Sequence, residues 1–159
     1  MLYQHELYGR VLSSMATLSV FIGYCGSGKS QLLRMIAFAC PTVKVVDEGF
    51  VDPQSSQDHE TRGKVWDALK AGQDCAVGSM DCANPKWRVC LERAVNENAP
   101  GTRLAWVVLE NNVERCNENC RRDKSKPRQV EGNIAQNERW RTRWTTPEDA
   151  FIMGVYPLP

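Results

Sequence analysis

Histidine is scarce in this sequence of 159 residues, and long apolar runs are missing. The two histidines, His5 and His59, form no Ser–His–Asp or Cys–His pattern that would predict a nucleophilic catalyst. No apolar run reaches the roughly 18 residues that a membrane span needs. The first six residues lack the basic start of a secretory signal. We therefore expect a cytoplasmic protein with no membrane partner.

Neither the net charge nor the cysteine content indicates a specialised class of protein. The chain has 20 basic and 19 acidic residues, so a strongly basic nucleic-acid coat is excluded, although a local basic patch is not. Seven cysteines are an odd number for a disulfide scaffold, and they are spread from Cys25 to Cys120. Only Cys116 and Cys120 approach the spacing of zinc ligands, and the histidines lie far away in sequence. We expect reduced core thiols and no zinc.

Short apolar segments alternate with helical patterns along the chain. The expected strands are residues 17–22, 43–46, 74–80, 104–109 and 151–156. The expected helices are residues 30–40, 58–71, 84–97, 113–122 and 129–141. This alternation predicts a single α/β domain over residues 1–159, with a mainly parallel sheet flanked by helices. Residues 50–57 are expected to form a loop, and residues 1–16 have no clear assignment.

The strongest motif lies between the first expected strand and the first expected helix. The run Gly23-Tyr24-Cys25-Gly26-Ser27-Gly28-Lys29-Ser30 matches G-x-x-x-x-G-K-[ST] at every fixed position. Glycines let successive backbone N–H groups turn towards phosphate oxygens, and the helix start adds partial positive charge. Lys29 provides a cation for the β- and γ-phosphates, and Ser30 a hydroxyl for Mg²⁺. The expected ligands of ATP, or of another nucleoside triphosphate, are Gly23, Gly26, Ser27, Gly28, Lys29 and Ser30.

Two acidic residues follow expected strands at the edge where α/β sheets bind ligands. Asp47 ends the second strand and could accept a proton from an acceptor hydroxyl; Glu48 and Asp52 are rivals for that role, and a solvated loop acid is the simpler alternative. Asp81 ends the third strand, where a carboxylate beside such a loop commonly holds Mg²⁺ or its water. The alternative for Asp81 is a cap of the next helix.

Basic residues are candidates for contacts with phosphate. Asn84 and Arg88 share a helix start, and Arg88 could hold an acceptor phosphate or form an ordinary surface ion pair. An arginine-rich lid is expected at about residues 113–128. In it, Arg115 and Arg122 share one helix face and could reach the γ-phosphate, with Arg121 as a further candidate. The alternative is a solvated charged helix.

Residues 115–143 carry nine basic residues against four acidic ones, a net charge of +5. Such a window predicts a segment that faces an anion. Trp140 and Trp144 lie among its arginines and could stack on bases. Being four apart, they could instead share the buried face of an amphipathic helix.

In this order, the motifs resemble the small P-loop kinases of the polynucleotide 5′-kinase and zeta-toxin-like group. The resemblance rests on residues 23–30, on Asp47, on residues 81–88 and on the lid pattern, and it spans most of the chain. It implies Mg²⁺-dependent transfer of the γ-phosphoryl group of ATP to a hydroxyl. The chain departs from the group in having no arginine soon after Asp47, since the next one is Arg62.

The resemblance also implies roles for individual residues. Asp47 would be the general base, Lys29 and Arg122 would stabilise transition-state charge, and Arg88 would hold the acceptor phosphate. Related kinases phosphorylate a 5′ end, a hydroxymethyl pyrimidine within phage DNA, such as hydroxymethyluracil, or a small metabolite. We expect a nucleic acid acceptor, with DNA favoured over RNA. A small-molecule kinase, and an ATPase or switch without phosphoryl transfer, remain alternatives.

Overall fold

The computed structural model describes residues 15–47 and 58–157. Within them, five strands form one parallel sheet in the order β2-β3-β1-β4-β5, so the predicted α/β class is confirmed. The strands are β1 (Thr17–Ile22), β2 (Lys44–Val46), β3 (Cys75–Gly78), β4 (Arg103–Leu109) and β5 (Phe151–Met153). The predicted loop at 50–57, the rival acids Glu48 and Asp52, and residues 1–14 lie outside the described residues.

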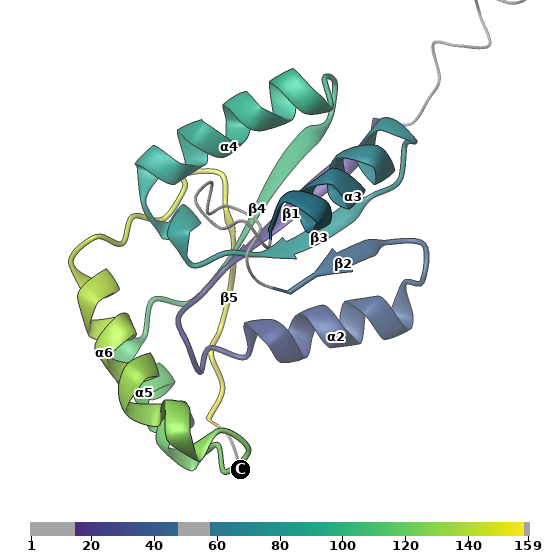
Figure 1. The fold of residues 1–159 in the computed structure, drawn as a ribbon. Coiled ribbons are helices and arrows are strands. Elements are labelled where there is room, and N and C mark those ends of the chain that lie inside the picture. Colours follow the sequence, from purple (N-terminus) through teal and green to yellow (C-terminus); the bar gives the residue numbers. More distant parts are fainter. Residues whose placement is uncertain (1–14, 48–57, 158–159) are drawn as a thin grey trace, which may run out of the picture.

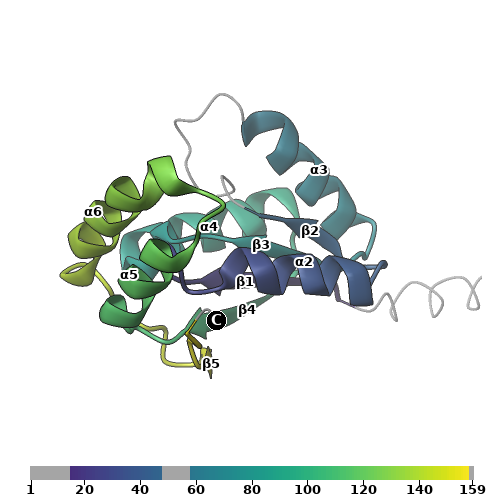
Figure 2. The ribbon, with the colours of Figure 1, turned by 90° about the horizontal axis from the view of Figure 1, so that it is seen from below.

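Helices flank the sheet, with α2 and α4 on opposite sides of it (Figures 1 and 2). The α-helices are α2 (Lys29–Ala39), α3 (Asp58–Lys70), α4 (Pro85–Asn98), α5 (Val113–Arg122) and α6 (Val130–Arg141). Two short 3-10 helices that the sequence pattern did not predict, η1 (Asp81–Ala83) and η2 (Pro127–Gln129), precede α4 and α6. None of the helices in the described ranges has both the length and the apolar character of a membrane span.

Burial in the centre of the sheet explains why the apolar segments form strands. Leu18, Val20 and Ile22 of β1 are fully buried, because β1 pairs with β3 on one side and with β4 on the other. The edge strand β5 is more exposed. It ends at Met153, earlier than predicted, and β3 is likewise shorter than predicted at both ends.

The sheet brings the expected site residues to one edge. Because all pairings are parallel, the carboxyl ends of β1, β2 and β3 lie together. Residues 23–30, Asp47 and Asp81 follow those three strands. The helices α5 and α6 lie side by side, next to the connection from β1 to α2, in both views (Figures 1 and 2).

The start of α4 provides a test of local stability. Asn84 is the N-cap, its side chain accepts a hydrogen bond from the Lys86 amide at 3.0 Å, and Pro85 occupies the first turn, as the sequence predicted. Replacing Asn84 by Ala should lower the free energy of unfolding by about 1 kcal/mol, because that amide loses its partner. Urea denaturation measures the change. The control Asn96→Ala alters an exposed position of the same helix, and an equal effect of both substitutions would contradict the cap.

Candidate nucleotide-binding site

Residues 23–30, here called the P-loop, join β1 to α2 in a conformation that depends on glycine. Gly26 has φ 80° and Gly28 has φ 91°, both in the left-handed region. Gly28 is also the N-cap of α2, and its position offers no side chain to bind the first N–H groups of that helix. The first turn of α2 contains no acidic residue. These N–H groups and the helix dipole are therefore suited to bind an anion.

Two P-loop glycines are also required by close packing. A Cβ on Gly23 would lie 2.5 Å from the Ser27 Oγ. A Cβ on Gly26 would collide with the backbone oxygen of Cys116 and would lie 2.8 Å from the Cys120 Sγ. The contacts of Gly26 with Cys116 and Cys120 show that α5 packs directly against the P-loop.

Asp47 lies beside both polar residues at the end of the P-loop. The Ser30 Oγ donates a hydrogen bond to Asp47 Oδ1 at 3.1 Å, and the Lys29 Nζ is 4.0 Å from the same oxygen. Gly78 at the end of β3 leaves room for them, since a Cβ there would lie 3.3 Å from Lys29 Nζ and 3.4 Å from Asp47 Oδ1. The Lys29 side chain is 11% exposed and that of Asp47 31%, so the ammonium is partly withdrawn from water.

The oxygen atoms at this point fit Mg²⁺ in their chemistry. A hydroxyl from Ser30 and a carboxylate from Asp47 are hard oxygen ligands of the kind that Mg²⁺ prefers. Across the described ranges, no group of three or more His, Cys, Asp or Glu residues could hold a metal ion. Mg²⁺ here would therefore need phosphate oxygens and water as further ligands. Asp81 is half-buried at the start of η1, and its role toward Mg²⁺ stays a prediction.

Arg88 makes main-chain contacts that the sequence did not reveal. Its Nη1 donates to the carbonyl oxygens of Cys82 at 2.9 Å, Ala83 at 3.4 Å and Thr145 at 2.8 Å. It thereby ties η1 to the segment that follows α6. The predicted contact of Arg88 with an acceptor phosphate, and that of Asn84 beside it, stay predictions.

The first part of the predicted lid is the helix α5, which has the bounds that the sequence predicted and which packs against the rest of the protein. The Arg115 Nη1 donates to the carbonyl oxygen of Val155 at 2.9 Å. Arg122 forms an ion pair with Glu118 on the same helix. Both arginines and Arg121 are exposed. Their predicted action on a γ-phosphate stays a prediction.

Three buried asparagines connect α5 and α6 to the P-loop, and sequence reasoning missed them. Asn137 is completely buried and binds both the N–H and the carbonyl of Cys25, at 2.9 and 3.0 Å. It also donates to Asn117 Oδ1 at 2.9 Å. Asn119 donates to the carbonyls of Gly26 and Tyr156, both at 2.9 Å. The only signal in the sequence was asparagine at otherwise apolar-facing helix positions.

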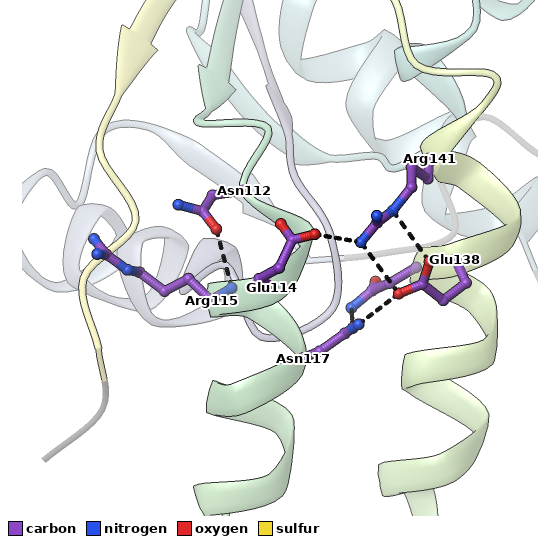
Figure 3. A network of polar contacts seen from close by, with 7 residues as sticks. Asn112, Glu114, Arg115, Asn117, Glu138 and Arg141 are labelled. Carbon is purple, nitrogen blue, oxygen red and sulfur yellow. Dashed lines mark hydrogen bonds and ion pairs between the residues drawn. The ribbon is translucent and has the colours of Figure 1, made fainter.

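The asparagine contacts continue into an ion-pair network at the surface, seen in Figure 3. Asn117 donates to Glu138 Oε1 at 2.9 Å. Arg141 pairs with Glu138 at 3.1 Å and with Glu114 at 2.7 Å, which links α6 to α5. Because Arg141 is 45% exposed, these ion pairs contribute little stability individually, and the buried amides fix the geometry.

The two tryptophans proposed for base stacking occupy other environments. Trp140 belongs to the hydrophobic core, as the alternative predicted. Trp144 lies beyond the end of α6, so it does not share a helix face with Trp140. It stacks on the ring of Tyr24, with the ring centroids 4.4 Å apart. Base stacking is therefore wrong for the buried Trp140, and for the half-buried Trp144 it stays a prediction.

Two buried hydroxyls in the P-loop have no hydrogen-bond partner within the described part of the chain. They are Tyr24 OH and Ser27 Oγ. Burial raises the pKa of Tyr24 to about 12, so the phenol stays protonated at neutral pH. An unpartnered buried hydroxyl costs about 1–3 kcal/mol, and a phosphate oxygen would be a suitable acceptor for Ser27.

Comparison with solved structures places this arrangement among known folds. The chain shares its fold with a fungal RNA kinase. That structure has a TM-score of 0.57 and 13% sequence identity, and the match covers 92% of this chain and 77% of that one. Polyphosphate kinase 2 from Arthrobacter aurescens gives a TM-score of 0.49 at 12% identity, with 89% of this chain and 61% of that one covered. No protein-family model and no curated protein matches the sequence.

The buried thiols of Cys82 and Cys116 should react slowly with alkylating reagents. Burial raises the pKa of Cys116 to about 12, helped by the nearby Cys120 and Cys25, and burial likewise raises the pKa of Cys82 to about 12. Each unit of increase in pKa lowers the thiolate fraction about tenfold at neutral pH.

Iodoacetamide at neutral pH should therefore modify the exposed Cys40 and Cys90 first, and Cys82 and Cys116 last, as followed by peptide mass spectrometry. In urea all sites should react at similar rates, which controls for local sequence effects. Alkylation of Cys82 or Cys116 in the folded protein as fast as that of Cys40 would contradict this order.

Proposed function

We propose that this protein is an ATP-dependent kinase that transfers the γ-phosphoryl group to a hydroxyl on a nucleic acid. The observation that carries the proposal is the convergence of Lys29, Ser30 and Asp47 at one end of the P-loop. A cation, a hydroxyl and a carboxylate meet there at the start of a helix whose N–H groups can bind phosphates. The fold, shared with an RNA kinase, supports the same class of reaction.

The proposed reaction forms a bond between the acceptor oxygen and the γ-phosphorus and breaks the bond to the β–γ bridging oxygen, so ADP leaves. The P-loop amides and Lys29 hold the phosphates and stabilise the charge that develops on them. Asp47 takes the proton of the acceptor hydroxyl. Bound Mg²⁺ would neutralise phosphate charge and would be held by the Ser30 hydroxyl and phosphate oxygens, with Asp81 as its predicted carboxylate partner.

The basic surface supports a nucleic acid as the acceptor. All nine basic residues of the window 115–143 are exposed. They lie on α5, on α6, and in the segments between and just after them. Both helices are bonded to the P-loop, through Asn119 and Asn137. Only Arg122 and Arg141 among them form ion pairs with acidic residues in the described ranges. Such a surface attracts a polyanion more strongly than a neutral metabolite.

The role of Asp47 can be tested separately from nucleotide binding. Asp47→Asn should lower kcat by about 100-fold or more while the Kd for Mg²⁺·ATP changes little, because only proton acceptance is removed. Lys29→Ala is the matched comparison and should abolish activity, since the cation on the phosphates is lost. Steady-state kinetics and equilibrium binding measure both effects. A parallel loss of ATP affinity in Asp47→Asn would instead make Asp47 a metal-binding or structural residue.

The acceptor can be identified by the fate of labelled phosphate. The wild type should transfer ³²P from γ-labelled ATP to 5′-hydroxyl DNA, to 5′-hydroxyl RNA or to duplex containing hydroxymethyluracil. Label that a 5′-phosphatase removes identifies an end kinase, and label that resists it identifies the modified base. Transfer should weaken as salt is raised, because phosphate contacts release counterions. Equal release of phosphate with and without every acceptor would overturn the kinase proposal in favour of an ATPase.

A further inference from the structure

The carbonyl groups of the P-loop require donors as much as its amides require a ligand. When successive N–H groups turn inward to one anion, the intervening carbonyls must turn outward into the protein. A carbonyl buried without a donor costs about 1–3 kcal/mol, and one that turned inward would repel phosphate. The P-loop conformation therefore depends on whatever satisfies these outward carbonyls.

The structure supplies a donor for three consecutive carbonyls. The oxygen of Tyr24 accepts from the Ser27 amide at 3.1 Å, within the loop itself. The oxygen of Cys25 accepts from Asn137 at 3.0 Å, and that of Gly26 from Asn119 at 2.9 Å. Two of the three donors thus come from α6 and α5, over 90 residues away in sequence.

Asn137 also removes one amide from the set that can face phosphate. The Cys25 N–H already donates to Asn137 Oδ1 at 2.9 Å, and the Ser27 N–H is taken by Tyr24. This leaves the amides of Gly26, Gly28 and Lys29, together with that of Ser30, for the phosphates. Asn137 is fully buried with all its amide groups bound, so it has a single orientation.

We propose that Asn137 and Asn119 are positioning residues that hold the P-loop in its phosphate-binding conformation from the α5–α6 pair. This inference rests on the proposed nucleotide-binding function. It assigns to α5 and α6 a second task besides carrying the basic surface.

Asn137→Ala and the isosteric Asn137→Asp test the proposal. The first removes the hydrogen bonds that Asn137 makes to the N–H and carbonyl of Cys25. The second keeps an acceptor for the N–H but faces the carbonyl with another oxygen. Both should weaken Mg²⁺·ATP binding by about tenfold or more and raise KM for ATP without raising KM for the acceptor. Asn119→Ala should act in the same direction through Gly26. The control is Asn133→Ala, one turn earlier on α6 and half-buried, which should leave binding within about twofold of wild type.

Amide hydrogen exchange gives a readout that needs no nucleotide. In the wild type the Cys25 amide should be protected, and in Asn137→Ala it should exchange about tenfold faster or more, while amides in the middle of β1 and β4 keep their protection. A variant that has simply lost global stability would lose protection at all of these amides. Asn137→Leu, which nearly preserves volume and also removes the acceptor for the Cys25 N–H, is the substitute if the Ala variant does not fold.

The possible outcomes separate the two proposals. If the wild type binds Mg²⁺·ATP and both Asn137 variants bind it within about twofold, the positioning role is overturned and the nucleotide site stands. Unchanged exchange at Cys25 in the Ala variant also overturns the positioning role. A third outcome is that the wild type binds no nucleotide while the Cys25 amide loses protection in Asn137→Ala as expected. In that case the asparagines hold the loop and the proposed function fails.

Discussion

The hydrogen bonding of one short loop is the constraint on which the site depends. The P-loop must turn its amides to one side. It can do so only if glycine permits a left-handed backbone and if buried donors form hydrogen bonds with the carbonyl groups on the other side. Both conditions are met here. Gly26 has positive φ and packs against α5, while Asn137 and Asn119 donate hydrogen bonds to the outward carbonyls of Cys25 and Gly26. The sheet fixes the loop at one end through β1, and α5 and α6 fix it from the side.

The charged groups of the site are arranged around this fixed loop. Lys29, Ser30 and Asp47 meet because β2 and β1 flank β3 in a parallel sheet, and because β3 ends in a glycine that leaves space for their side chains. On the other side, the exposed arginines and lysines of the α5–α6 region add positive charge at the surface. The buried polar groups thus give the site its geometry, and the exposed basic groups add the positive charge on which the proposed nucleic acid acceptor depends.

Much of the fold could be predicted, because local patterns determine it. The alternation of apolar strands with helices, the Asn84-Pro85 helix start and the exact span of α5 follow from period and capping preferences. The P-loop and the placement of Asp47 after the second strand were also visible. The partners of buried polar groups were not. Asn137 and Arg88 contact main chain far away in sequence, and no local pattern specifies which residue will lie opposite. The sequence pattern likewise did not show that the ring of Trp144 stacks on that of Tyr24.

The central claim is that the P-loop binds a polyphosphate through the main-chain amides that its own contacts leave available, those of Gly26, Gly28, Lys29 and Ser30. Isothermal titration calorimetry of the wild-type protein with Mg²⁺·ATP, and with adenosine in the same Mg²⁺ buffer, measures this most directly. The account predicts a saturable heat with one site for the triphosphate, no such heat for the nucleoside, and its disappearance in Lys29→Ala. The absence of a saturable heat for every nucleoside triphosphate tried, in protein whose fold is verified by circular dichroism, would contradict it.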